Sequence, residues 1–281
     1  MNDVYISKHN IQRLKHIQGL LNQLHPEEPP LALHVPGSPM PHGSIIVFPG
    51  SFNPPTKAHL ALLKQAHDYA RLHEHTYLYA AFSKRTVDKE NVERPLLVER
   101  IHLLDEVLKR RLSHTGILLF NRGLYIEQAQ SIYASFTGVR RLLFLLGFDK
   151  IVQILDPRYY ADRDAALTEL FSLAELLVAP RGVAGENELA KLLHQPQNER
   201  FAGSIHVLPF DARYRDMSST RIREGQDGAI HDTPQEVRRF IYETHVYTPP
   251  MRSIDGSIVD YYAKHVAQLN ALLASSKEWK K

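Results

Sequence analysis

The sequence predicts an α/β fold, in which a parallel sheet carries helices on both faces and further helices are appended at the two ends of the chain. Between Gly43 and Leu208, short apolar runs alternate with segments whose apolar residues recur at helical spacing. The runs are apolar throughout, which is typical of strands buried on both faces of a parallel sheet. Strands separated by helices form βαβ units, and such units place their strands in parallel.

The elements follow in order along the chain. Residues 4–24 have helical periodicity, and we interpret them as a helix packed on the domain rather than a partner-binding helix. The proline-rich stretch 26–41 excludes a helix or a central strand and predicts an extended connector. Strands are then expected at 45–48, 77–82, 117–120, 142–146, 176–179 and 205–208, and helices at 62–70, 95–112 and 234–247. A polar helix with a basic end, solvated and appended, is expected over 251–281.

Length and composition limit the classes of protein. The 281 residues suit one large domain with appendages, which we place at 1–42, 43–248 and 249–281. The absence of cysteine excludes disulfides, thiolate zinc sites and cysteine nucleophiles. A net charge of +3 is too small to indicate nucleic-acid binding. Without a long apolar stretch or a secretory signal, no membrane partner is expected and a cytoplasmic location is the default.

The first candidate site is the run PGSFNPPTKAH at 49–59, which leads from the first strand into a helix. Gly50 and Ser51 let backbone amides approach a ligand, Thr56 supplies a hydroxyl, and Lys57 supplies an ammonium group. His59 lies at the helix start, where N–H groups and the helix dipole favour phosphate. The chain has 16 histidines, so from the residues alone a phosphate site and an ordinary surface loop remain equally open.

The second candidate site is the run MSSTRIRE at 217–224, after the last expected strand. Ser218 or Ser219 is a suitable N-cap, and hydroxyls with free N–H groups at a helix start form an anion-binding nest. Arg221 and Arg223 are two residues apart, so on a helix they point in different directions and only one should face a ligand. A capped helix with solvated arginines is the alternative for this run.

Together the two runs resemble the signatures of the HIGH-type nucleotidyltransferase superfamily. The first signature, G-[ST]-F-[DN]-P-x-[HT]-x-[GA]-H in loose form, matches residues 50–59, and the second, [IM]-S-S-T-x-[IV]-R, matches residues 217–223. They occur in the family's order, about 160 residues apart. Asn53 with its following proline, and Thr56, resemble nicotinamide or nicotinate mononucleotide adenylyltransferases. Cytidylyltransferases and pantetheine-phosphate adenylyltransferases usually carry His at the place of Thr56 and Gly at the place of Ala58.

The resemblance implies a Rossmann-like nucleotidyltransferase domain over 43–248 that transfers AMP from ATP to nicotinamide or nicotinate mononucleotide, in NAD biosynthesis. It implies catalytic roles for His59, Lys57 and Arg223. The ATP-binding residues that it implies are Gly50, Ser51, Phe52, Thr56, Gly147, Asp149, Ser218, Ser219 and Thr220. The acceptor-binding residues that it implies are Asn53, Lys84, Tyr159 and Tyr160. Mg²⁺ is implied with ATP as substrate, and no metal site formed by the protein is expected.

Some assignments keep an alternative. Asp149 is implied to bond the adenosine ribose, but from the residues alone it could equally be a helix N-cap. Tyr159 or Tyr160 is implied to stack on the pyridine ring, the alternative being simple packing. The expected partners are ATP and a mononucleotide, no nucleic acid is expected, and a homo-oligomer is left open.

Two alternatives remain for the whole chain. One is an adenylyltransferase or cytidylyltransferase with another phosphorylated acceptor, which Thr56 and Ala58 argue against. The other is a non-catalytic nucleotide-binding regulatory protein, for which the terminal segments leave room. The sequence does not choose between nicotinamide and nicotinate mononucleotide.

Overall fold

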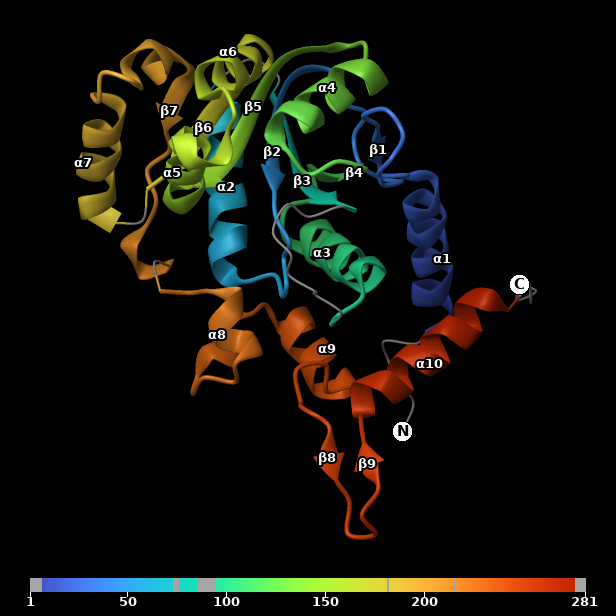
Figure 1. Ribbon diagram of the computed structural model, residues 1–281. Helices are drawn as coiled ribbons and strands as arrows, with labels where there is room; N and C mark the ends of the chain where they lie inside the picture. The colour runs from blue at the N-terminus through green and yellow to red at the C-terminus, as the bar shows by residue number, and fades with distance from the viewer. Residues whose placement is uncertain (1–6, 73–75, 85–93, 181, 215, 276–281) are drawn as a thin grey trace.

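The computed structural model of the chain describes residues 7–72, 76–84, 94–180, 182–214 and 216–275. Within these residues a seven-stranded sheet has the order β1-β4-β3-β2-β5-β6-β7 (Figure 1). All neighbouring strands pair in parallel except β1, which is antiparallel to β4. The strands are β1 Ala32–His34, β2 Gly43–Pro49, β3 Thr76–Ser83, β4 Thr115–Phe120, β5 Val139–Gly147, β6 Glu175–Ala179 and β7 Ile205–Val207. The predicted parallel sheet is confirmed, and every predicted strand is present.

Helices cover both faces of this sheet (Figure 1). Successive side chains of β2 point to opposite faces, so Ile46 and Phe48 join one core while Ile45 and Val47 join the other. The first core includes α1 Lys8–Gln23, α2 Lys57–Arg71 and α3 Leu97–Arg111; the second includes α4 Tyr125–Ser135, α5 Phe148–Leu155, α6 Arg163–Leu173 and α7 Gly182–Leu193. Burial on both faces explains why the strands are continuous apolar runs in the sequence.

The proline-rich connector differs in part from the expectation, because it contributes the edge strand β1. Prolines flank this strand without interrupting it, so its N–H groups stay available for pairing with β4. Asn121, directly after β4, fixes the connector: its Nδ2 donates to the carbonyls of His25 and Pro29, both at 2.9 Å, and its Oδ1 accepts from the N–H of Leu31 at 2.8 Å. The connector is therefore a fixed part of the sheet edge.

The N-terminal helix packs on the domain as interpreted, with Leu14 and Ile17 fully buried. The expectation of a solvated C-terminal appendage is wrong. After α9 Gln235–Thr244, the strands β8 Met251–Arg252 and β9 Ile258–Val259 form a projecting hairpin that leads into α10 Tyr261–Ala274 (Figure 1). One face of α10 is buried through Tyr262, His265 and Leu269.

Parts of several predictions lie outside the described residues: the start of the first helix at 4–6, and the basic end of the last helix with Lys277, Lys280 and Lys281. None of the helices in the described residues has both the length and the apolar character needed to cross a membrane.

The order of the strands reverses beside β2. From β2 the chain builds outward through β3 and β4, and it then returns to add β5, β6 and β7 on the other side. The loop that follows β2 and the helix α5 that follows β5 therefore leave adjacent strand ends in different directions. In open parallel sheets this topological switch point leaves a crevice where ligands bind. The loop at 50–56 and the segment from Gly147 onward both begin here.

Candidate active site

The loop after β2 is built around a buried aromatic ring. Phe52 has a positive φ of 43°, and its side chain is 1% exposed. Its ring contacts the rings of Phe48, Phe82 and His59 at centroid distances of 5.4, 5.1 and 5.2 Å. A Cβ atom on Gly50 would lie 2.9 Å from the Phe52 ring. A side chain at this position would therefore crowd the Phe52 ring.

Thr56 and His59 cap the start of α2 together. The N–H of His59 donates to Thr56 Oγ1 at 3.3 Å, and the N–H of Thr56 donates to His59 Nδ1 at 3.0 Å. Since a backbone N–H can only donate, Nδ1 is the acceptor and the neutral ring carries its proton on Nε2. The cap therefore sets both the orientation and the tautomer of His59. Thr56 itself is fully buried, and the neighbouring Lys57 is exposed.

The second motif forms the short helix α8 Ser219–Arg223, with Ser218 as its N-cap. Ser219 Oγ donates to the carbonyl of Pro54 at 2.8 Å. Arg223 Nη1 donates to the carbonyl of Asn53, also at 2.8 Å, and Arg223 Nη2 donates to Thr220 Oγ1 at 3.1 Å. Two side chains of the second motif thus bind the backbone of the first. The two distant runs form one structural unit.

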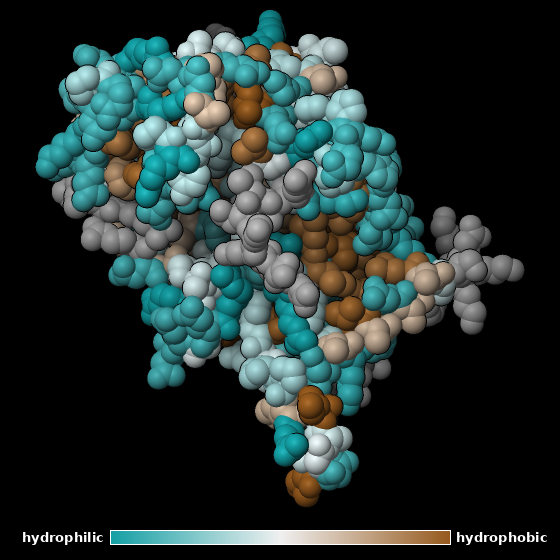
Figure 2. Space-filling view, viewed as in Figure 1, coloured by the Kyte–Doolittle hydropathy of each residue, from teal (hydrophilic) through white to brown (hydrophobic). Residues whose placement is uncertain are grey.

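The two arginines of α8 diverge as predicted. Arg221 Nε donates to Gln226 Oε1 and Arg221 Nη1 donates to the carbonyl of Asp216, both at 2.9 Å, so this side chain serves its own loop. Arg223 alone of the pair reaches the loop after β2. The surface over α8 is mostly hydrophilic (Figure 2). Arg223 is also the arginine to which the resemblance assigns the phosphate.

Further contacts that the sequence did not suggest hold the same loop. Asn53 is fully buried, and its Nδ2 donates to the carbonyl of Arg94 at 3.2 Å while its Oδ1 accepts from the Tyr247 hydroxyl at 2.7 Å. Arg100 Nη1 donates to the carbonyl of Ser51 at 3.1 Å. Burial raises the pKa of Tyr247, which therefore remains a neutral donor. In this arrangement the Asn53 amide is bound to protein groups on both sides.

The segment after β5 is more open. Gly147 is the N-cap of α5, which leaves Asp149 in the first helical turn with an exposed side chain. The N-cap alternative for Asp149 is therefore wrong. Tyr159 is 62% exposed, whereas the Tyr160 hydroxyl donates to the carbonyl of Ile154 at 2.8 Å. The geometry of Tyr160 fits packing, and Tyr159 is the tyrosine of this pair that a ligand ring could reach.

Lys84 and Arg85 follow β3. Lys84 Nζ donates to the carbonyl of Leu21 near the end of α1, at 2.8 Å. The amine thus links the N-terminal helix to the carboxyl edge of the sheet. The next residue, Arg85, whose charge would also suit an acceptor phosphate, lies outside the described residues.

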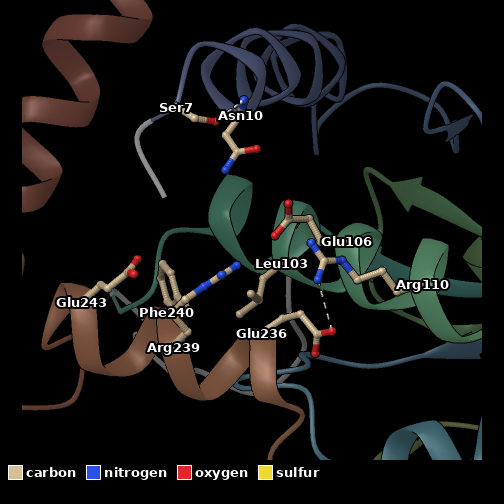
Figure 3. Close-up of a pocket in the computed structure, with 9 residues that line it drawn as sticks. All are labelled: Ser7, Asn10, Leu103, Glu106, Arg110, Glu236, Arg239, Phe240 and Glu243. Atoms are coloured by element: carbon tan, nitrogen blue, oxygen red, sulfur yellow. Dashed lines mark hydrogen bonds and ion pairs between the residues drawn. The ribbon is translucent and has the colours of Figure 1, made fainter. Parts of the chain in front are cut away.

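A cavity of about 240 Å³ lies elsewhere, between α1, α3 and α9 (Figure 3). Its lining is mostly charged or polar and consists of Ser7, Asn10, Leu103, Glu106, Arg110, Glu236, Arg239, Phe240 and Glu243. It includes none of the site residues predicted from the sequence. In the part of the chain that the structure covers, no group of three or more His, Asp or Glu side chains is arranged to hold a metal ion.

Known proteins are similar to this chain over part of its length. The chain is 28% identical over 146 residues to the "Putative nicotinamide mononucleotide adenylyltransferase" of Schizosaccharomyces pombe, over 50% of this chain and 55% of that protein. The chain thus spans about half the length of this curated relative. A crystal structure titled as a "Putative Nicotinate-nucleotide Adenylyltransferase" from Vibrio parahaemolyticus matches 72% of this chain and 99% of its own, with 16% identity and a TM-score of 0.32. This TM-score is too low to support the fold assignment, which rests on the strand order described above.

The family match covers more of the chain than the fission-yeast relative does. The model of the cytidylyltransferase-like family covers residues 47–225, which is more than half of the chain and includes both motifs. The chain therefore belongs to the cytidylyltransferase-like family of nucleotidyltransferases.

Proposed function

We propose that this protein transfers the adenylyl group of ATP to nicotinamide or nicotinate mononucleotide and releases pyrophosphate. One observation carries the proposal: Ser219 and Arg223 of the second motif hydrogen-bond the carbonyls of Pro54 and Asn53 in the first. This joins the two motif segments at the switch point of the sheet. Asn53 and Thr56 support the mononucleotide acceptor through the sequence resemblance, and the name of the fission-yeast relative supports the same acceptor.

The reaction is an in-line attack of an acceptor phosphate oxygen on the α-phosphorus of ATP. The new P–O bond forms as the bond to the pyrophosphate oxygen breaks, so no protein nucleophile is required. Catalysis then consists of positioning and stabilisation of charge. In this proposal, the Nε2–H of His59 and the Lys57 ammonium donate to the α-phosphate oxygens. Ser219, Thr220 and Arg223 donate to the oxygens of the leaving pyrophosphate. Thr56 acts through His59, because its backbone N–H fixes the imidazole.

The remaining assignments divide between the two substrates. Gly147 and Asp149 would hold the adenosine, with the exposed carboxylate accepting from the ribose hydroxyls. Lys84 and Tyr159 would contact the mononucleotide, and Asn53 would support that side from behind through its buried amide. Mg²⁺ would enter as the counterion of the triphosphate and offset its charge.

The test is a pyrophosphate-release assay on the purified chain with Mg²⁺ and ATP, supplying nicotinamide mononucleotide in one arm and nicotinate mononucleotide in another. We expect release that depends on both ATP and a mononucleotide and that EDTA abolishes. Arms with CTP, or with other phosphorylated acceptors, test the alternative transferase. No release with any acceptor, together with tight ATP binding in calorimetry, would identify a nucleotide-binding protein instead and reject the proposal.

A further inference from the structure

The C-terminal helix α10 is attached to the chain just before α3 by directional polar bonds. Arg94 forms an ion pair with Asp260, the N-cap of α10, with Nη1 donating to Oδ1 at 3.0 Å. The Arg94 guanidinium also lies over the ring of Tyr262, 5.3 Å from its centroid. The hydrogen bond from Arg94 holds the pKa of Asp260 below its usual range, so the carboxylate is charged at neutral pH.

A second set of bonds lies at the start of α3. Glu99 is fully buried, and its carboxylate accepts from the Tyr262 hydroxyl and lies 2.7 Å from His265 Nε2. The Tyr262 hydroxyl in turn accepts from the N–H of Leu96 at 2.8 Å. Tyr262 and His265 of α10 and Glu99 of α3 thus fix the backbone after Pro95, while Asp260 binds the residue before it.

This anchored backbone continues directly into the candidate site. The carbonyl of Arg94 accepts from Asn53 Nδ2, and Asn53 lies in the loop that ends in His59. The other side of Asn53 is held by Tyr247 and, through its carbonyl, by Arg223. A continuous series of contacts therefore runs from α10 through Arg94 to Asn53.

The chemistry of these contacts favours positioning over simple attachment. Covering apolar surface needs only groups such as Leu269, which joins the main core. Burying a carboxylate with a histidine and a tyrosine is costly, and it adds direction rather than much net stability. A loop that must hold reacting groups within a fraction of an ångström depends on such direction.

We propose that α10 is a brace for the active-site loop, and that Asp260 and Tyr262 are positioning residues that act through Arg94 on Asn53. This role rests on the proposed function, since it concerns the geometry in which His59 and Arg223 meet the triphosphate. The carbonyl of Arg94 binds the Asn53 side chain while Arg223 of α8 binds its backbone carbonyl, so that Asn53 is fixed by both segments before substrate binds.

The primary variant is Asp260→Asn, because asparagine caps a helix as well as aspartate does but loses the charge that holds Arg94. Asp255→Asn is the matched control: it makes the same chemical change in the hairpin, where the carboxylate bonds Ser257. We expect kcat for pyrophosphate release to fall about tenfold in Asp260→Asn, with KM for ATP within about twofold. Asp260→Glu keeps the carboxylate and should recover most of the rate.

Hydrogen exchange supplies a readout that does not need catalysis. In Asp260→Asn and in Tyr262→Phe, the amides of residues 51–53, 56 and 57 should exchange at least about fivefold faster than in the parent chain, while those of β5 remain unchanged. The measurements are made at a temperature where the variants are folded. If loop exchange and kcat then equal those of the parent chain, the proposed brace is wrong, even if the variants have a lower melting temperature. If the parent chain releases no pyrophosphate, the proposed function fails, and unchanged loop exchange still decides against the brace.

Discussion

The loop that follows β2 and the helix α5 that follows β5 begin side by side at the switch point of the sheet, but the two regions are constructed differently. Residues 52–56 are buried, and side chains from α8 and the segment after α9 bind their backbone or the Asn53 amide. Arg100 of α3 binds the carbonyl of the preceding residue, Ser51. After β5, Asp149 and Tyr159 are exposed, and an added Cβ on Gly147 would meet no atom within 4 Å.

This difference indicates a division of labour at the candidate site. A loop fixed by several independent bonds holds its groups in place before substrate arrives, which is what charge stabilisation in a transition state requires. An open segment can adjust to its ligand and contributes chiefly to affinity. Substitutions in the first region should therefore lower kcat, and substitutions in the second should raise KM.

The largest effect is expected for His59→Ala. Loss of the Nε2–H donor should lower kcat about 10²- to 10³-fold, as for other preorganised donors to developing negative charge. The fold should persist, because losing a helix cap costs only about 1 kcal/mol. Steady-state pyrophosphate release and a thermal melt measure the two quantities.

His67→Ala is the control for this variant, since His67 lies on the same helix with a partly exposed side chain. It should keep the parent rate. A kcat of His59→Ala equal to that of the parent would remove His59 from the reaction and break the proposed contrast between the two regions.

A smaller loss is expected for Arg223→Ala. Removing a charged donor on the leaving-group side should raise KM for pyrophosphate in the reverse reaction roughly ten- to hundredfold. The forward kcat should also fall, because the Asn53 carbonyl loses its partner. Steady-state kinetics of the forward reaction and of pyrophosphorolysis, its reverse, measure these changes.

Arg221→Ala offers a close control, because this arginine is on the same turn of helix but bonds Gln226 and Asp216. Near-parent kinetics are expected for it. Equal impairment of the two variants would show that the helix as a whole, rather than the direction of Arg223, matters.

The smallest effect is expected for Asp149→Asn, in the open region. Weakening one ribose contact should raise KM for ATP roughly two- to tenfold while kcat stays within about twofold. The melting temperature should not change, because the side chain is exposed. Asp68→Asn, near the far end of α2, controls for loss of a surface charge. A fall in kcat without a change in KM would place Asp149 in the rate-determining step and erase the contrast.

The sheet was predictable because each of its central strands is a short, fully apolar run between helical segments. That pattern is local, and burial on both faces of a parallel sheet is its direct cause. The role of α10 was missed for the opposite reason. The buried residues of this helix are Tyr262, His265 and Leu269, and two of these three carry polar groups whose partner, Glu99, is more than 160 residues away.

The candidate site divides in the same way. The two motifs and the divergence of Arg221 from Arg223 could be deduced from spacing and helical geometry. The capping pair was also within reach, since Thr56 stands three residues before His59, the spacing of a capping box. The partners of Asn53 were not, because Arg94, Arg223 and Tyr247 lie 41, 170 and 194 residues away along the chain.

The sequence by itself determined the family, the strands of the parallel sheet and the positions of the two motifs, because each depends on neighbouring residues and local backbone preference. Tertiary structure alone decided that the Phe52 ring lies against Gly50, that protein groups bind Asn53 at both ends of its amide, and that the last helix is anchored beside the candidate-site loop. Such contacts depend on which distant groups come together when helices cover both faces of the sheet, and residue spacing along the chain does not predict these long-range contacts.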